Sequence, residues 1–196
     1  MIDKSLRQYY QDGKEVGPYR KGLELIAGKG REITPSSIAK NVVKRLRDAD
    51  IYIRAFWVIG YPGETREEIS ESLRFFKDSG CNWISIMIAA PIAGSDLYYF
   101  SKEQGLLLHN DIDKFHFGKA NISLDHSTPK EFQQLRYRLN LDLNFVNNYD
   151  MRNGHPEKAL MGLEDVINRA PNHAFANYYI SECYQILGDQ EKAEKY

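Results

Sequence analysis

Two short apolar stretches separated by one helix-length segment constrain the fold of this chain most. Residues 51–59 (IYIRAFWVI) and 83–90 (WISIMIAA) are rich in β-branched and aromatic residues, and a turn former follows each, which is typical of strands. Between them, Thr65 and Glu68 have the spacing of a capping box, which predicts a helix from there to about Ser79. This order predicts two parallel strands joined by a right-handed crossover.

Further helices are expected on both sides of this unit. Thr34 followed by Pro35 is a favourable helix start, and this helix should run to about Asp48. Shorter helices are expected near residues 23–26 and over residues 95–105. Because two strands alone would be poorly covered, either more strands exist elsewhere or the N-terminal segment contributes one.

The second half of the chain contains an internal repeat. The hexapeptide GHPEKA at 154–159 recurs as GDQEKA at 188–193, with an offset of 34 residues. This offset is the period of the tetratricopeptide (TPR) repeat, in which each unit is a helix–turn–helix. An unrelated helical hairpin with a chance match is the alternative. Since such units bury their apolar faces on neighbours, the helices need a surface on which to dock.

These patterns predict three parts: an N-terminal segment of uncertain structure (1–21), an α/β part (22–126) and a TPR-like helical part (127–196). Apolar residues make up 42% and charged residues 27%, as in soluble globular proteins. A formal net charge of -1 without a basic stripe disfavours a nucleic-acid partner. No apolar run approaches the ~18 residues of a membrane span. Without a signal-peptide pattern, and with two distant cysteines expected to stay reduced, the chain is predicted to be cytoplasmic.

The sequence FWVIGYPGET at 56–65 resembles a segment of the radical SAM superfamily, most closely of members that often carry a cobalamin-binding domain. In that family, the fifth barrel strand ends in a G-x-P-G-E-T turn that opens the next helix. The segments GKGR at 28–31 and TP at 34–35 resemble the family's approach to that strand. The segment APIAGSDLY at 90–98 is similar to the P-x-P-G-T-x-L-Y pattern after the sixth strand, with mild departures at Ala93 and Ser95.

The resemblance covers about residues 22–105, the last third of such a barrel. It implies an α/β fold: a partial (β/α) barrel with parallel strands, followed by the all-α TPR-like region. The turn positions that match the family are Gly60, Pro62, Gly63, Glu64, Thr65, Pro91, Gly94 and Ser95. We interpret the glycines and prolines as turn formers. Glu64 is favoured electrostatically near a helix N-terminus, with a catalytic carboxylate as the alternative.

Strand alternation separates the side chains of each strand into two faces. The more apolar faces, which should meet the helices, carry Ile51, Ile53, Ala55, Trp57 and Ile59, and then Ile84, Ile86 and Ile88. In the family, strands five and six contact the adenine of S-adenosylmethionine. The resemblance therefore implies cofactor contacts for Arg54, Val58, Ile59, Gly60, Met87, Ile88 and Ala89. For Arg54, a salt bridge at the rim or a solvent-facing side chain is the alternative to a carboxylate of the cofactor or substrate.

The chain lacks the cysteines of a radical SAM cluster. The family's [4Fe–4S] cluster needs a C-x-x-x-C-x-x-C loop because thiolates are its ligands, whereas this chain has only Cys81 and Cys183. We therefore expect no cofactor in this chain alone and no catalysis by it. The parent enzyme would use the cluster, S-adenosylmethionine and possibly cobalamin. His109, Asp111, Asp113 and His116 match no known metal-site spacing, so no metal site is predicted.

Two functional hypotheses follow. The chain is either the C-terminal part of a radical SAM enzyme, with a missing N-terminal half as partner, or a non-catalytic interaction module. In the second case, an α/β remnant supports TPR-like helices that bind a partner protein. An upstream cluster loop in the same gene would favour the first hypothesis. A standalone α/β enzyme is disfavoured because the sequence has no dinucleotide-binding, P-loop or nucleophile-elbow motif.

Overall fold

A computed structural model describes residues 35–196 of the chain. The chain divides into two compact units, Met1–Ile51 and Tyr52–Tyr196. The described part of the first unit is the helix α3 (Pro35–Asp48), which has the predicted bounds. The predictions for residues 1–21, for a helix at 23–26 and for the motif at 28–31 lie outside the described residues.

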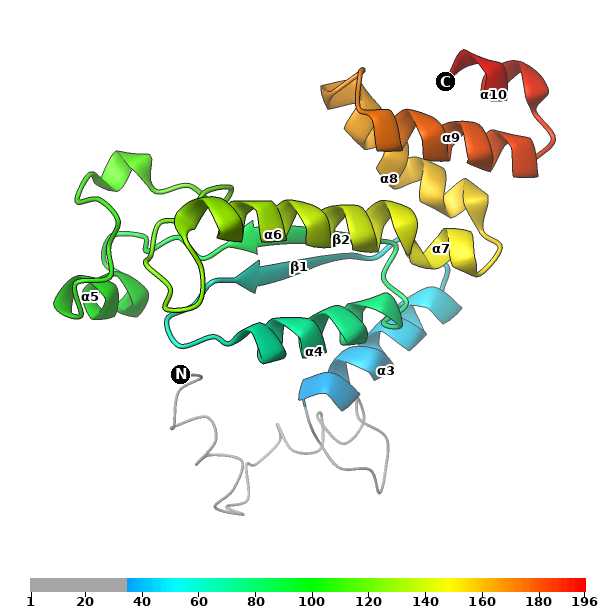
Figure 1. Cartoon of the computed structure of the whole chain (residues 1–196). Helices are drawn as coiled ribbons and strands as arrows, with labels where there is room; N and C mark the ends of the chain where they lie inside the picture. The colour runs from blue at the N-terminus through cyan, green and yellow to red at the C-terminus, as the bar shows by residue number, and fades with distance from the viewer. Residues whose placement is uncertain (1–34) are drawn as a thin grey trace. The chain divides into compact units, whose positions relative to one another are not determined.

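The second unit begins with a parallel pair of strands, as predicted. The strands β1 (Arg54–Ile59) and β2 (Trp83–Ile88) pair in register from Arg54 opposite Trp83 to Ile59 opposite Ile88. They are joined through the helix α4 (Arg66–Lys77), which runs along β1 (Figure 1). The capping box of α4 is present, with Thr65 as N-cap and Glu68 at the third position.

The first strand is shorter than the predicted 51–59. The N–H of Ile51 donates to the carbonyl of Leu46 at 2.9 Å, so Ile51 closes the end of α3. Pairing with the second strand starts only at Ile53, whose carbonyl accepts the N–H groups of Asn82 and Trp83. The competition between helix capping and strand pairing therefore sets this boundary.

The rest of the unit is a long connection and a series of helices. The connection holds a short helix, whose N-cap is Ser95, and one 3₁₀ turn. A second capping box, formed by Thr128 and Glu131, stands at the start of the next long helix. In chain order, these elements are α5 (Asp96–Glu103), η1 (Ile112–Lys114), α6 (Pro129–Leu141), the π-helical turn η2 (Asp142–Val146), α7 (Tyr149–Arg152), α8 (Pro156–Arg169), α9 (Ala174–Ile186) and α10 (Gln190–Lys195).

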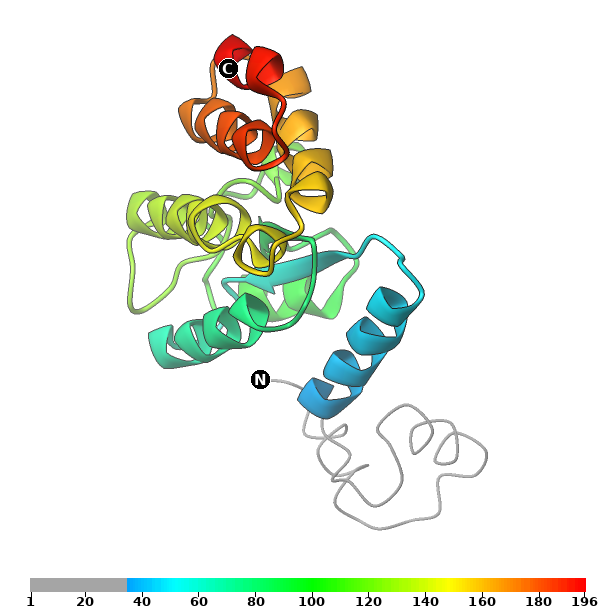
Figure 2. The same ribbon diagram turned by 90° about the vertical axis from the view of Figure 1, so that its right-hand side faces the viewer.

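The two copies of the repeated hexapeptide have the same local structure. Gly154 and Gly188 both adopt the left-handed conformation, with φ of 75° and 78°. Each precedes a helix, α8 or α10, in which the repeated alanine, Ala159 or Ala193, is buried. The helices α8, α9 and α10 lie together at one end of the unit (Figure 2). The repeat is therefore structural as well as sequential, and α8 with α9 forms a helix–turn–helix.

Part of the core lies on the sheet face that alternation predicted to be apolar. Trp57 contacts Phe76 of α4, with ring centroids 5.1 Å apart, and Ile59 and Ile88 are almost completely buried. On the opposite face, Phe56 is 66% exposed. The described residues thus confirm a mixed α/β fold with a parallel pair of strands, whereas a barrel stays a prediction. None of the described helices has both the length and the apolar character needed to cross a membrane.

Side chains from α6 and η2 close the outer edge of β2. The side chain of Asn144 accepts the N–H of Ile84 and donates to the carbonyl of Ile84, both at 2.8 Å. These are the two hydrogen bonds that a neighbouring strand would otherwise make with Ile84. Arg136 donates to the carbonyl of Ile86 at 3.2 Å, and the N–H of Ile88 donates to the carbonyl of Phe117 at 2.7 Å. Because unpaired main-chain groups at an edge invite further strands, β2 is built as the last strand of its sheet.

Replacement of Asn144 by alanine should destabilise the protein by about 2–4 kcal/mol, because it leaves both main-chain groups of Ile84 buried without a partner. Urea denaturation measures the loss. Asn153→Ala is the matched control, because the exposed Asn153 side chain makes one local hydrogen bond, to the carbonyl of Tyr149, and should cost less than about 1 kcal/mol. Equal losses in the two variants would contradict a special role for Asn144.

Candidate functional site

The turn after β1 explains the glycines of its motif. Gly60 has a φ of 85°, and a Cβ atom on it would lie 2.7 Å from Cε1 of Phe132 in α6. Gly63 has a φ of 82°, but a Cβ atom there would meet nothing within 4 Å. Both positions favour glycine for their backbone conformation, and Gly60 must in addition leave room for an aromatic ring. The turn therefore fixes how closely α6 packs on the carboxyl end of β1.

Glu64 holds this turn together. Its carboxylate accepts the main-chain N–H of Gly60. Burial raises the pKa of Glu64, and nearby Glu68 raises it further, while the hydrogen bonds from Gly60 and Tyr61 and the proximity of His126 oppose this shift. Glu64 thus closes the turn back onto the strand, in addition to lying one residue before the N-cap of α4.

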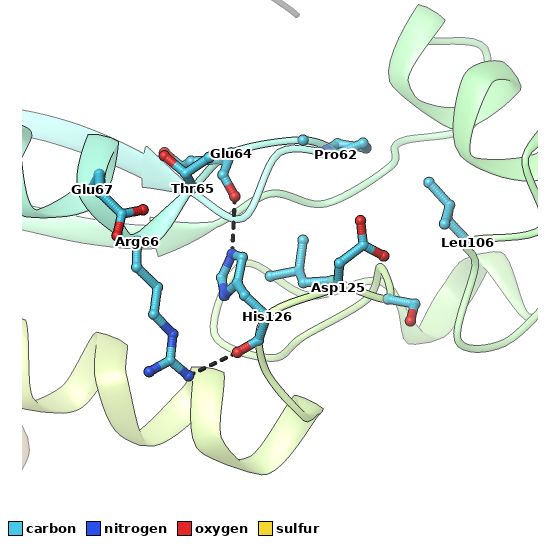
Figure 3. A pocket seen from close by; sticks show the side chains of 11 residues that line it. Pro62, Glu64, Thr65, Arg66, Glu67, Leu106, Asp125 and His126 are labelled. Carbon is cyan, nitrogen blue, oxygen red and sulfur yellow. Dashed lines mark hydrogen bonds between the residues drawn. The ribbon is translucent and has the colours of Figure 1, made fainter.

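His126 fastens the long connection to the same turn. Its Nε2 lies 2.9 Å from the main-chain carbonyl of Glu64, to which it donates, and its Nδ1 lies 2.9 Å from Oγ of Ser127. Arg66 donates to the carbonyl of His126 at 2.7 Å and to Oγ of Ser127 at 3.1 Å (Figure 3). Sequence reasoning missed His126 because it stands in an irregular polar segment, about 60 residues after its partners.

A hollow lined by both polar and apolar residues lies beside the turn. It encloses about 400 Å³ between the start of α4 and the connection. Glu64, Arg66, Asp125 and His126 contribute titratable groups to its wall (Figure 3). Since Glu64, Arg66 and His126 are already engaged in the contacts above, they hold the turn in place. The residues that line the hollow are Pro62, Gly63, Glu64, Thr65, Arg66, Glu67, Leu106, Ser123, Leu124, Asp125 and His126.

The turn after β2 lies beside the turn after β1. The N–H of Ala89 still donates to the carbonyl of Ile59, at 2.8 Å, so the two chains leave the sheet together. Asn121, which is completely buried, donates to the carbonyl of Ala89 at 3.1 Å and ties the connection to this end. Pro91 is fully buried, Gly94 has a φ of 89°, and Ser95 caps α5. Both motifs therefore shape the carboxyl ends of the strands.

The structure gathers most of the predicted cofactor contacts at this end. Val58 lies opposite Met87 in the ladder, on the face away from the buried isoleucines. Gly60 and Ala89 follow in the two turns, and both are buried. Ile59 and Ile88 point into the core, which leaves only their main chain for a ligand. The set thus combines a few half-buried apolar side chains with main-chain groups.

Arg54 lies apart from this set, at the amino end of β1. Its Nη2 is 3.2 Å from Oδ2 of Asp165 in α8. This ion pair is consistent with the alternative role expected for Arg54, a salt bridge at the rim. The polar residues of the connection make local contacts instead. His109 stacks on Phe115, with ring centroids 4.8 Å apart, and its Nδ1 lies 3.0 Å from the main-chain carbonyl of Asp111, which caps η1.

The described residues do not fit an iron–sulfur cluster. Within residues 35–196, no group of three or more His, Cys, Asp or Glu side chains is arranged to hold a metal ion. Cys81 and Cys183 are both buried, and burial raises the pKa of Cys183 to about 12. A thiolate ligand is therefore disfavoured at Cys183.

Curated proteins similar to this chain are enzymes of two kinds. An uncharacterized methyltransferase of Pyrococcus horikoshii is 30% identical over 113 residues, which are 58% of this chain and 24% of that protein. The tRNA-2-methylthio-N(6)-dimethylallyladenosine synthases of two Dehalococcoides mccartyi strains are 26% identical over 117 residues, 55% of this chain and 28% of theirs. The chain thus spans about a quarter of the length of these relatives.

These similarities support a relation to the radical SAM enzymes in general, as the two motifs predicted. No protein-family profile matches the chain, and no solved structure matches it.

Substitution of the two turn glycines by alanine should separate backbone strain from steric conflict. Gly63→Ala should cost about 1–2 kcal/mol, because alanine is strained at positive φ. Gly60→Ala should cost at least about 2 kcal/mol more, because its Cβ atom also displaces Phe132. Urea denaturation of both variants tests this difference. If Gly60→Ala and Gly63→Ala lose equal stability, α6 is not seated on the turn as described.

The raised pKa of Glu64 predicts the direction in which the stability of the protein changes with pH. The folded protein holds this proton to higher pH than the unfolded chain, so the contribution of Glu64 to stability falls as the pH rises above about 4.3. Glu64→Gln lacks this loss. The urea midpoint of Glu64→Gln relative to the unsubstituted protein should therefore increase between about pH 4 and pH 6. Glu67→Gln, which removes an exposed charge from the same turn, is the control, and a decrease would contradict the prediction.

Proposed function

We propose that this chain is the C-terminal part of a radical SAM barrel, from the subgroup that often carries a cobalamin-binding domain. The observation that carries the proposal is that two motif turns, G-Y-P-G-E-T and P-I-A-G-S, lie side by side at the carboxyl ends of two paired parallel strands. In α/β barrels, ligands bind at this end of the strands. The names of the relatives, a methyltransferase and a methylthio-adenosine synthase, support a group-transfer reaction as the parent activity.

The two edges of the sheet support a place at the end of such a barrel. The outer edge of β2 is closed by Asn144, Arg136 and Phe117. In β1, the carbonyls of Ile53 and Ile59 face β2, so alternation directs the main-chain groups of Arg54, Phe56 and Val58 to the other edge. No main-chain hydrogen bond from residues 35–196 reaches that edge. Further strands of a barrel would therefore join at β1.

In this proposal, the carboxyl ends of β1 and β2 bind S-adenosylmethionine. Val58 and Met87 supply apolar contact to the adenine, while the backbone of Ile59, Gly60, Ile88 and Ala89, held by its own hydrogen bonds, shapes the wall beside it. Arg54, which is paired with Asp165, contributes to the wall of the barrel instead of contacting the cofactor.

The radical chemistry would come from polypeptide outside this chain. A [4Fe–4S] cluster held by a C-x-x-x-C-x-x-C loop would supply the electron that cleaves S-adenosylmethionine, and the described residues do not fit that cluster. This chain would bind and orient the nucleoside part of the cofactor. Its activity in isolation is accordingly proposed to be nil, and a cytoplasmic location is proposed with it.

An interaction module is the second candidate, and one surface favours it. On α9, Phe175, Tyr178 and Ile186 are exposed by 38%, 63% and 60%, although large apolar side chains are usually covered. In a TPR-like layer, this face would contact a partner protein. The two candidates are compatible, because this face and the carboxyl ends of the strands belong to different elements.

Joining this chain to the cluster-bearing part of a barrel tests the proposal. After anaerobic loading with iron and sulfide, the joined protein should produce 5′-deoxyadenosine from S-adenosylmethionine, and this chain alone should not. Met87→Ala should weaken S-adenosylmethionine binding roughly tenfold, because about 1.4 kcal/mol of apolar contact is lost. Phe175→Ala on α9 is the matched control and should leave the affinity unchanged. If no 5′-deoxyadenosine forms, or if both variants bind equally well, the proposal fails.

A further inference from the structure

The first helix of the TPR-like layer packs directly on the sheet. A Cβ atom on Gly162, in the middle of α8, would lie 2.2 Å from Cε3 of Trp83, the first residue of β2. The backbone of α8 thus rests on the indole ring, an approach that only glycine permits. Trp83 is 7% exposed and also meets Phe145 edge to face, with ring centroids 5.8 Å apart.

A second contact joins α8 to the other strand. Asp165 stands three residues after Gly162, so it lies on the same face of α8, and it pairs with Arg54, the first residue of β1. Arg54 and Trp83 lie opposite each other in the ladder. Residues paired in a parallel ladder point to the same side of the sheet, so α8 contacts both strands on one face.

This face is the one that α4 and α6 leave uncovered. Alternation places Arg54, Phe56 and Val58 of β1 on it, together with Trp83, Ser85 and Met87 of β2. Burial changes along it: Trp83 is covered by α8, whereas Phe56 is 66% exposed. The amino end of this face is therefore covered over β2, whereas Arg54 and Phe56 of β1 are exposed and Val58 and Met87 are half-buried.

Buried polar contacts fix α7 and η2 to the same end of the sheet. Asn82, just before β2, donates to the carboxylate of Asp150 in α7 at 2.7 Å, and both residues are buried. The side chain of Asn82 also accepts the N–H of Ile53 at 2.6 Å. In Figure 1, α7 and α8 accordingly lie at the amino ends of both strands.

We propose that α8 is the floor of the open sheet face, and that the TPR-like layer closes the amino end of the α/β part. A ligand at Val58 and Met87 would then approach from the carboxyl ends of the strands. This role is different from partner binding, which would use the outward face of α9. It goes beyond the proposed cofactor site, and its tests involve no S-adenosylmethionine, so the two proposals fail separately.

The substitution Gly162→Ala tests whether α8 forms this floor, because the proposal predicts the direction in which the melting temperature changes. In a helix that touches nothing at this position, Gly→Ala raises the melting temperature, by roughly 3 °C for a chain of this size. If α8 rests on Trp83, Gly162→Ala should instead lower it by roughly 5 °C or more. Asn168→Ala, at an exposed site of the same helix, is the matched control and should raise it slightly. An increase in Gly162→Ala would overturn the proposal.

If Gly162→Ala does not fold, the same substitution made in a Trp83→Leu variant still tests the proposal. In Trp83→Leu the ring is absent, so adding Gly162→Ala to it should raise the melting temperature. An equal decrease in both backgrounds would show that Trp83 is not the neighbour that matters.

Fluorescence tests the closure itself. The chain has two tryptophans, so Trp57→Phe leaves Trp83 as the only one. Adding Gly162→Ala should increase the acrylamide quenching constant of Trp83 at least twofold, because the floor is displaced. Unchanged quenching in a folded variant would contradict the proposal.

Discussion

A two-stranded parallel sheet leaves main-chain groups without partners at both edges, and the structure depends on how one edge is closed. Asn144 supplies both bonds that a neighbouring strand would give Ile84. It reaches this position because the helix that starts at Pro129 ends in a π-helical turn. A buried N–H or carbonyl without a partner lowers the free energy of unfolding by about as much as several apolar contacts raise it. The position of α6 is thus set by polar pairing as well as by packing.

The turn after β1 serves this same packing. Gly60 has no side chain where Phe132 of α6 sits, and Glu64 closes the turn by accepting the N–H of Gly60. The motif that resembles a radical SAM family therefore acts, within this chain, as a device that holds the carboxyl ends of the strands in a fixed shape. That is a physical reason for such a motif to accompany a binding site without contacting the ligand through its own side chains.

The helical repeat shares a buried cluster with the amino end of β2. Trp83 and Phe145 belong to the same buried cluster as Leu163 and Ile180 of the repeat helices. Repeat units of this kind need a surface on which to dock, and the amino end of β2 provides it. The repeat therefore contributes to the stability of the α/β part.

Local patterns in the sequence determined the parallel pair of strands, the capping boxes at Thr65 and Thr128, the buried face of the sheet and the 34-residue repeat. These features follow from neighbours within a few residues, or from alternation along one strand. Only the tertiary structure decided the roles of Asn144, His126 and Gly162, whose partners lie about 60 to 80 residues away. A lone polar residue or glycine acquires such a role only when folding brings a distant main chain or ring beside it.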